Sequence, residues 1–266
     1  MCGIVAYIGG ESALPRLIEG LRRLEYRGYD SAGVAVLDGD GLWVRKDIGR
    51  VSDLAGHLQG GPGTQVGIAH TRWATHGGVT QLNAHPHTDG TGRIAVVHNG
   101  IIENGSEIRA RLSKRGVVFK SETDTEVLPH LIREAWQGDP LQAVRNALAH
   151  VRGTYGIAVV FADAPDVLVV ARNGSPLVVG LGRGETVVAS DPQAVVAHTR
   201  QVVYLQDKEI ALVTREGAQV STLEGREVQL PVETLDGDYG LASKEGFPHF
   251  MLKEIHEQPR SIRDSM

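Results

Sequence analysis

Short runs of hydrophobic residues recur along most of the chain and predict a protein rich in β-strands. Most runs are rich in Val and Ile and are bounded by Gly, Asp, Asn or Pro. Several are apolar at both odd and even positions, which predicts strands that are covered on both faces. The predicted strands span residues 3–8, 31–38, 42–48, 65–70, 93–100, 156–163, 166–172, 175–182, 185–190, 201–205 and 209–214.

Helical periodicity is found in fewer places. Apolar residues three and four positions apart predict a helix over 12–25. Residues 104–114 also predict a helix, and so do residues 139–151, which open on an Asp-Pro start signal. Residues 123–136 begin with Thr-x-x-Glu, the pattern of a capping box. Pro129 then falls inside that helix, which favours a kink or a later start.

The order of these elements predicts packed sheets with helices outside them. One strand and one helix are followed by several strands, then by helices, then by many strands, which is neither a regular βαβ alternation nor an all-β pattern. Residues 224–246 are polar and rich in turn-forming residues, so we expect a boundary there. Residues 247–266 contain a pattern typical of a short amphipathic helix.

Composition narrows the class of protein. The chain has 266 residues, of which 41% are hydrophobic and 22% charged, which is typical of a soluble globular protein. The net charge of −5 argues against a nucleic-acid partner. No apolar run approaches the roughly 18 residues needed to span a membrane, and the N-terminus lacks the pattern of a secretory signal. We therefore expect a cytoplasmic protein.

The only cysteine of the chain stands at position 2. Removal of Met1 would give this residue a thiol and a free α-amino group together. An α-amino group has a pKa of about 7.7–8.0, so it can serve as a base for the thiol near neutral pH. On its own, Cys2 is also compatible with a role as a small buried hydrophobic residue.

Three polar stretches lie within apolar or Gly-rich surroundings, and with Cys2 they predict a site for acyl transfer: HTRWATHG (70–77), HNGIIEN (98–104) and SETDTE (121–126). Asn99 and Gly100 can supply an amide and a backbone N–H to an oxyanion, although Asn-Gly is also a common turn dipeptide. Arg72 can hold a carboxylate and Asp124 an ammonium group. The alternatives are a surface arginine and an aspartate that caps a helix.

Five histidines lie between positions 70 and 98, namely His70, His76, His85, His87 and His98. A metal site is the competing interpretation of this stretch. The spacing of the histidines is irregular, and no further cysteine accompanies them. The sequence therefore predicts neither a bound metal nor a cofactor.

The motifs together resemble those of a known family. MCGIV at the N-terminus, RRLEYRGYDSAG (22–33), HTRWATHG, NAHPH (83–87), HNGIIEN and SETDTE are similar to the glutaminase domain of the glutamine–fructose-6-phosphate aminotransferases, which are class II glutamine amidotransferases. The similarity covers about residues 2–240. It implies an α+β fold of the N-terminal-nucleophile type, in which two antiparallel sheets lie between layers of helices (αββα).

The resemblance also implies roles for particular residues. Cys2 would be the nucleophile and its own amino group the base, with Asn99 and Gly100 at the oxyanion positions. Arg72 would bind the α-carboxylate of L-glutamine, and Asp124 its α-amino group. The remaining implied residues are Trp73, Thr75 and His76, which would line the pocket, and Arg27, which would position the thiol.

The resemblance implies a longer parent protein as well. Residues 241–266, which include MLKEIHEQP (251–259), resemble the linker toward a sugar-isomerase domain that binds fructose-6-phosphate. We expect the ammonia to be used there, in glucosamine-6-phosphate synthesis, and the parent to be a homo-oligomer. Two alternatives stay open, namely an amidotransferase with another ammonia acceptor and an inactive binding module that has kept the pocket.

Overall fold

The computed structural model describes residues 2–39, 41–74, 77–236, 246–248 and 250–264. The chain divides into two units, Met1–Asp236 and Gly237–Met266. The second unit contains helix α6 (Phe250–Asp264), which includes Pro259. The assignment of residues 2–240 to a glutaminase domain and of 241–266 to a linker stays a prediction. No helix in the described part of the chain combines the length and the apolar character that crossing a membrane requires.

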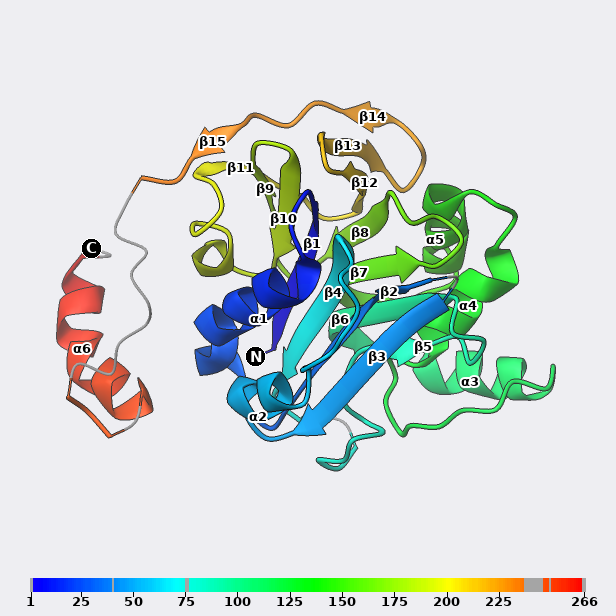
Figure 1. Ribbon diagram of the computed structural model, residues 1–266, viewed down its shortest axis with the longest axis horizontal. Helices are drawn as coiled ribbons and strands as arrows, with labels where there is room; N and C mark the ends of the chain where they lie inside the picture. The colour runs from blue at the N-terminus through cyan, green and yellow to red at the C-terminus, as the bar shows by residue number, and fades with distance from the viewer. Residues whose placement is uncertain (1, 40, 75–76, 237–245, 249, 265–266) are drawn as a thin grey trace. The chain divides into compact units, whose positions relative to one another are not determined.

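The first unit is built on two antiparallel sheets (Figure 1). One sheet has the strand order β15-β11-β9-β10-β1-β4-β2-β3, and the other has the order β14-β13-β12-β8-β7-β6-β5. The strands are β1 (Gly3–Gly9), β2 (Ser31–Asp38), β3 (Gly41–Ile48), β4 (Val66–Arg72), β5 (His87–Thr88), β6 (Ile94–Ile102), β7 (Gly153–Phe161), β8 (Leu168–Asn173), β9 (Val178–Leu181), β10 (Glu185–Ala189), β11 (Gln201–Tyr204), β12 (Glu209–Thr214), β13 (Gly217–Thr222), β14 (Glu227–Val228) and β15 (Glu233–Thr234).

Alternate residues of the central strands build two separate cores. Ile4, Ala6 and Ile8 of β1 pack with Val97 and Val160 of the other sheet in the core between the sheets. The opposite face of the second sheet packs against the helices α3 (Gly105–Ser113), α4 (Val127–Ala135) and α5 (Pro140–Leu148). Both faces of these strands are therefore covered, as their apolar sequences predicted.

The outer face of the first sheet carries helix α1 (Ala13–Leu24). The helix packs so closely on β1 that a Cβ on Gly20 would lie 2.8 Å from a methyl group of Val5. The short helix α2 (Val51–Gly56) lies beside α1 and β3. The layers therefore run helix, sheet, sheet, helix, and the predicted αββα arrangement is confirmed (Figure 1).

Most predicted elements are confirmed, and the differences have local causes. All eleven predicted strands overlap observed ones. The elements that were missed are short or weakly apolar: α2 has six residues, β13 is weakly apolar, and β5, β14 and β15 have two residues each. The capping box expected at Thr123 is wrong, because α4 begins only at Val127. The Glu126 carboxylate instead accepts from the backbone N–H groups of Lys120 and Ser121, each at 2.7 Å.

The helix starts predicted from capping residues also had different outcomes. Asp139 caps α5 as expected, since its Oδ1 accepts from the backbone N–H of Gln142 at 3.0 Å. Ser12 precedes α1 but makes no capping hydrogen bond with its side chain. Pro129 falls within the first turn of α4, so the later start accommodates it without a kink.

Strand β2 supports the loop that carries His85. Gly33 of β2 pairs with His70 on β4 and with Lys46 on β3. A Cβ on Gly33 would overlap the carbonyl oxygen of His85, so the loop can cross the strand only because this position has no side chain.

We expect Gly33→Ala to lower the free energy of unfolding by about 1–3 kcal/mol, the usual cost of overpacking. Gly56→Ala is the matched control, because a Cβ there meets no atom within 4 Å. Chemical denaturation of both variants measures the difference. Equal stability of the two would contradict the close packing of the His85 loop on β2.

Candidate active site

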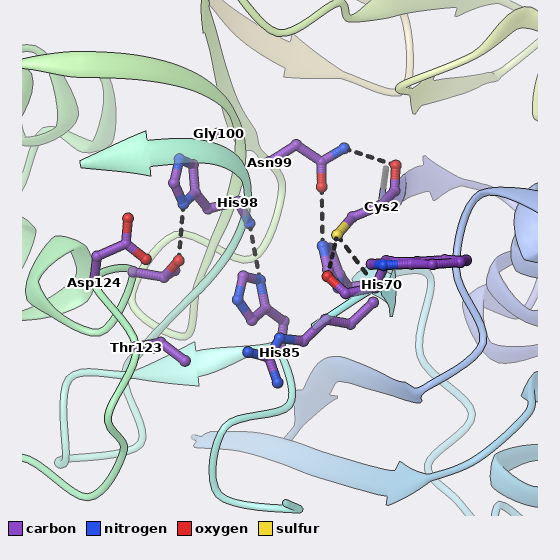
Figure 2. Close-up of a pocket in the computed structure, with 11 residues that line it drawn as sticks. Cys2, His70, His85, His98, Asn99, Gly100, Thr123 and Asp124 are labelled. Carbon is purple, nitrogen blue, oxygen red and sulfur yellow. Dashed lines mark hydrogen bonds between the residues drawn. The ribbon is translucent and has the colours of Figure 1, made fainter. Parts of the chain in front are cut away.

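The three polar stretches and the N-terminal cysteine meet at one pocket (Figure 2). Cys2 precedes β1, which is a central strand of its sheet, between β10 and β4. The other polar residues come from the end of β4, from β6 and from the loop before α4. The pocket is lined by Cys2, His70, Arg72, Trp73, His85, His98, Asn99, Gly100, Thr123, Asp124 and Thr125.

The Cys2 thiol is partly exposed and lies against the backbone of Trp73. Its Sγ accepts from the Trp73 N–H at 3.3 Å and lies 3.6 Å from the Trp73 carbonyl oxygen. An N–H group that faces the sulfur can stabilise negative charge that develops on it. The position is therefore that of a thiol held at the pocket wall, and the alternative of a buried hydrophobic residue is wrong.

Asn99 joins the two sheets at the pocket. Its Nδ2 donates to the Cys2 carbonyl oxygen at 3.1 Å, and its Oδ1 lies 3.0 Å from Nε2 of His70. Gly100 follows with φ +135°, and a Cβ there would overlap the carbonyl oxygen of Thr154. Both residues lie within β6, so the alternative of a simple Asn-Gly turn is wrong.

Arg72 and Asp124 both line the pocket and carry opposite charges. The Arg72 side chain is only 4% exposed, which excludes a surface arginine, and its Nη1 donates to the Gly78 carbonyl at 3.3 Å. The Asp124 Oδ2 accepts from the Ile102 N–H at 2.7 Å. Asp124 therefore anchors the end of β6 rather than capping α4. Burial lowers the pKa of Arg72, while the charge of Asp124 opposes that change.

The other predicted site residues lie in different surroundings. Trp73 is 41% exposed and contacts Tyr29 edge to face, with 5.6 Å between ring centroids. Thr75 and His76 lie outside the described residues. Arg27 does not line the pocket, and its guanidinium donates to Asp191 at 2.8 Å and to the Ser190 carbonyl at 3.4 Å.

Arg27 is connected to the strand that follows the nucleophile through the neighbouring loop. The Ser190 backbone N–H donates to the Ile4 carbonyl at 3.1 Å, and the Ser190 Oγ accepts from the Ile4 N–H at 3.0 Å. The loop that Arg27 contacts is thus bonded to the strand two residues after Cys2. This path is compatible with a positioning role.

Four of the five histidines form a buried layer beneath the pocket. The His70 and His85 rings stack with 4.2 Å between centroids, and His85 meets His87 edge to face at 4.8 Å. The fourth ring, His98, bonds the Thr125 hydroxyl at 2.8 Å. Within the described ranges no group of three or more His, Cys, Asp or Glu residues is arranged to hold a metal ion. The sequence showed these residues as a histidine group but not that His70, His85 and His98 line the pocket.

Burial keeps these imidazoles neutral. It lowers the pKa of His70 to about 3, and it holds the pKa values of His85 and His87 well below the ordinary value. The pKa of His98 is lowered as well, for the same reason. A base whose pKa is lowered in the folded state takes up protons on unfolding, so the folded state loses stability as the pH falls below about 6.5.

We expect the free energy of unfolding to fall between pH 7 and pH 5 by up to about 1.4 kcal/mol per pH unit for each buried imidazole. Urea denaturation at several pH values measures the slope. His87→Asn should reduce the slope by about one proton relative to the unchanged chain, because His87 is one of the buried rings. A stability that stays constant over this range would show that the rings are not buried in neutral form.

Comparison with known proteins agrees with the family resemblance of the sequence motifs. A family model described as "Glutamine amidotransferase domain" matches residues 70–197. The chain is 55% identical over 267 residues to glutamine–fructose-6-phosphate aminotransferase [isomerizing] of Symbiobacterium thermophilum and 52% identical over 270 residues to that of Gloeobacter violaceus. Both alignments cover 100% of this chain and 44% of the relative, so the chain spans less than half the length of these relatives.

Solved structures with the same fold belong to related enzymes. The glutamine phosphoribosylpyrophosphate amidotransferase from B. subtilis superimposes with a TM-score of 0.71 at 27% identity, over 84% of this chain and 49% of that one. A structure titled as the allosteric regulatory enzyme of purine biosynthesis gives 0.72 at 28% identity, with the same two coverages. The chain therefore contains a glutamine amidotransferase domain and has the N-terminal-nucleophile fold of these enzymes.

Proposed function

We propose that this chain hydrolyses the side-chain amide of L-glutamine to glutamate and ammonia through a thioester on Cys2. The observation that carries the proposal is that the Asn99 amide lies beside the only cysteine, since the Asn99 Nδ2 donates to the Cys2 backbone carbonyl oxygen at 3.1 Å. A nucleophile next to β1 and an oxyanion donor on β6 of the facing sheet are the minimum that acyl transfer requires.

The first half of the reaction forms the thioester. After removal of Met1, the α-amino group of Cys2 takes the thiol proton, and Sγ attacks the side-chain carbonyl carbon of glutamine. The oxyanion is stabilised by the Asn99 amide and the Gly100 N–H. The C–N bond then breaks, and the amino group returns the proton to the departing nitrogen, which leaves as ammonia.

The second half of the reaction regenerates the thiol. The α-amino group removes a proton from water, and the resulting hydroxide attacks the thioester carbon. The same donors stabilise the second oxyanion, and the C–S bond breaks. Glutamate leaves, and the thiolate recovers its proton. One glutamine and one water thus give one glutamate and one ammonia.

Substrate binding in this proposal uses two charged side chains of the pocket. The buried Arg72 guanidinium holds the α-carboxylate, and the Asp124 carboxylate holds the α-ammonium. Asp124 keeps one oxygen on Ile102 and has the other for the substrate. Trp73, Thr75 and His76 are assigned to the pocket from the sequence motif, and Arg27 positions the thiol through the Ser190 loop.

The fate of the ammonia is a separate proposal. Because the curated relatives are named glutamine–fructose-6-phosphate aminotransferases and extend well beyond the aligned region, we assign the ammonia to fructose-6-phosphate in a sugar-isomerase domain of a longer protein. We further assign that protein to the cytoplasm as a homo-oligomer, in keeping with the single free cysteine.

We expect the purified chain, processed at Met1, to release glutamate and ammonia in equal amounts from glutamine. A diazo-ketone analogue of glutamine should label it once, at Cys2, and Cys2→Ser should lose nearly all turnover, since a serine hydroxyl is the poorer nucleophile. The assay follows glutamate, ammonia and hexosamine together, with and without fructose-6-phosphate. Mass spectrometry confirms the N-terminus.

Three results would contradict these assignments. A label on another residue would remove Cys2 from the mechanism, and an inactive processed chain would favour the binding module. Hexosamine formed by these 266 residues alone would place the sugar site within them and not in a further domain.

We expect Arg72→Lys and Asp124→Asn each to lower kcat/KM for glutamine by an amount equivalent to roughly 2–4 kcal/mol, because the first loses the bidentate contact to the α-carboxylate and the second leaves the α-ammonium without a charged partner. Lysine keeps the charge of Arg72 but loses its planar fork, and asparagine can keep the hydrogen bond to Ile102. Glu122→Gln is a control on the same loop outside the pocket lining. Near-normal kinetics of either variant would remove that residue from substrate binding.

A further inference from the structure

The Asn99 amide makes two hydrogen bonds that together fix its orientation (Figure 2). A carbonyl oxygen only accepts, so the amide nitrogen of Asn99 must face Cys2. The amide oxygen then faces Nε2 of His70, and an oxygen also only accepts. His70 must therefore carry its proton on Nε2 and donate it to Asn99.

The His70 ring is held so that this donor cannot move away. His70 lies in β4, where it pairs with Ile4 on one side and with Gly33 on the other, and it is 0% exposed. The His85 ring stacks on it at 4.2 Å. A buried, neutral imidazole has a single N–H, so its donation to Asn99 also defines the tautomer.

We infer that His70 is a positioning residue that acts through Asn99. The inference rests on the proposed function, because it concerns the donor of the oxyanion site. The His70 Nε2–H holds the Asn99 oxygen, so the amide nitrogen points toward Cys2. One of its two N–H groups bonds the Cys2 carbonyl, and the other is directed to the reacting carbonyl.

Without this bond the orientation of the Asn99 amide depends on the Cys2 carbonyl alone. Rotation by 180° about the last side-chain bond would place the amide oxygen against the Cys2 carbonyl and the oxyanion, where it repels both. Removal of one oxyanion donor in another hydrolase costs about 10²–10³ in kcat. Misorientation of part of the molecules should cost less, about 10- to 100-fold.

The test compares two amide substitutions at the same position. His70→Gln places a carboxamide N–H near the position of Nε2, whereas His70→Asn places it one bond short of Asn99. Both are polar and uncharged, so they make similar demands on the buried site. His87→Asn is the control, because His87 bonds Thr123 and makes no hydrogen bond to Asn99. Each change is also combined with Asn99→Ala.

We expect His70→Asn to lower kcat about 10- to 100-fold with KM changed less than about 3-fold, and His70→Gln to recover most of the loss. In the Asn99→Ala background, His70→Asn should cause no further loss, because its effect passes through Asn99. His87→Asn should keep at least half of the kcat. Thermal denaturation of every variant confirms that it is folded.

Two outcomes would overturn the inference while leaving the proposed function intact. One is an unchanged kcat in folded His70→Asn. The other is the same fold-loss with and without Asn99, which would mean that His70 acts on the pocket independently of the amide. An unmodified chain without glutaminase activity, or a fully active Asn99→Ala variant, would instead overturn the proposed oxyanion site and the inference with it.

Discussion

A single hydrogen bond between the two sheets determines the geometry of the site, namely that from the Asn99 amide to the Cys2 carbonyl. Cys2 directly precedes a strand whose neighbours on both sides hold it in register, and Asn99 belongs to a strand of the facing sheet. Asn99 is therefore fixed by backbone pairing, and Cys2 is fixed by the paired strand that follows it. A nucleophile and a donor positioned in this way need little reorganisation during a reaction.

The same location imposes a cost on the core, because polar groups must be buried where the sheets meet. Four neutral imidazoles fill this layer. Their rings stack on one another and form hydrogen bonds with Thr123, Thr125 and Asn99. Neutral rings avoid the large penalty of a buried charge. The charged groups, Arg72 and Asp124, keep hydrogen bonds to the backbone.

Much of the fold followed from local patterns, whereas the packing of the buried histidines did not. Strands covered on both faces have long apolar runs, so their positions were predictable, and Asp139 before Pro140 marked a helix correctly. Thr123 and Glu126 followed a local rule that tertiary contacts override, since Glu126 bonds Lys120 and Ser121. The stacking of His70 on His85 depends on two segments that meet only through sheet pairing and a crossing loop, which no local pattern encodes.

The motif RGYDSAG shows why a long sequence signature can contain few reactive groups. Gly28 lies so close to the backbone between Arg72 and Trp73 that a Cβ would be 2.7 Å from the Arg72 carbonyl carbon. The Asp30 carboxylate accepts from the Ala74 N–H at 2.9 Å, and its backbone N–H donates to the Arg72 carbonyl at 3.0 Å. These residues do not line the pocket. They fix the backbone on either side of Trp73, and that backbone in turn faces the Cys2 sulfur. The nucleophile is therefore supported by residues that lie outside the pocket.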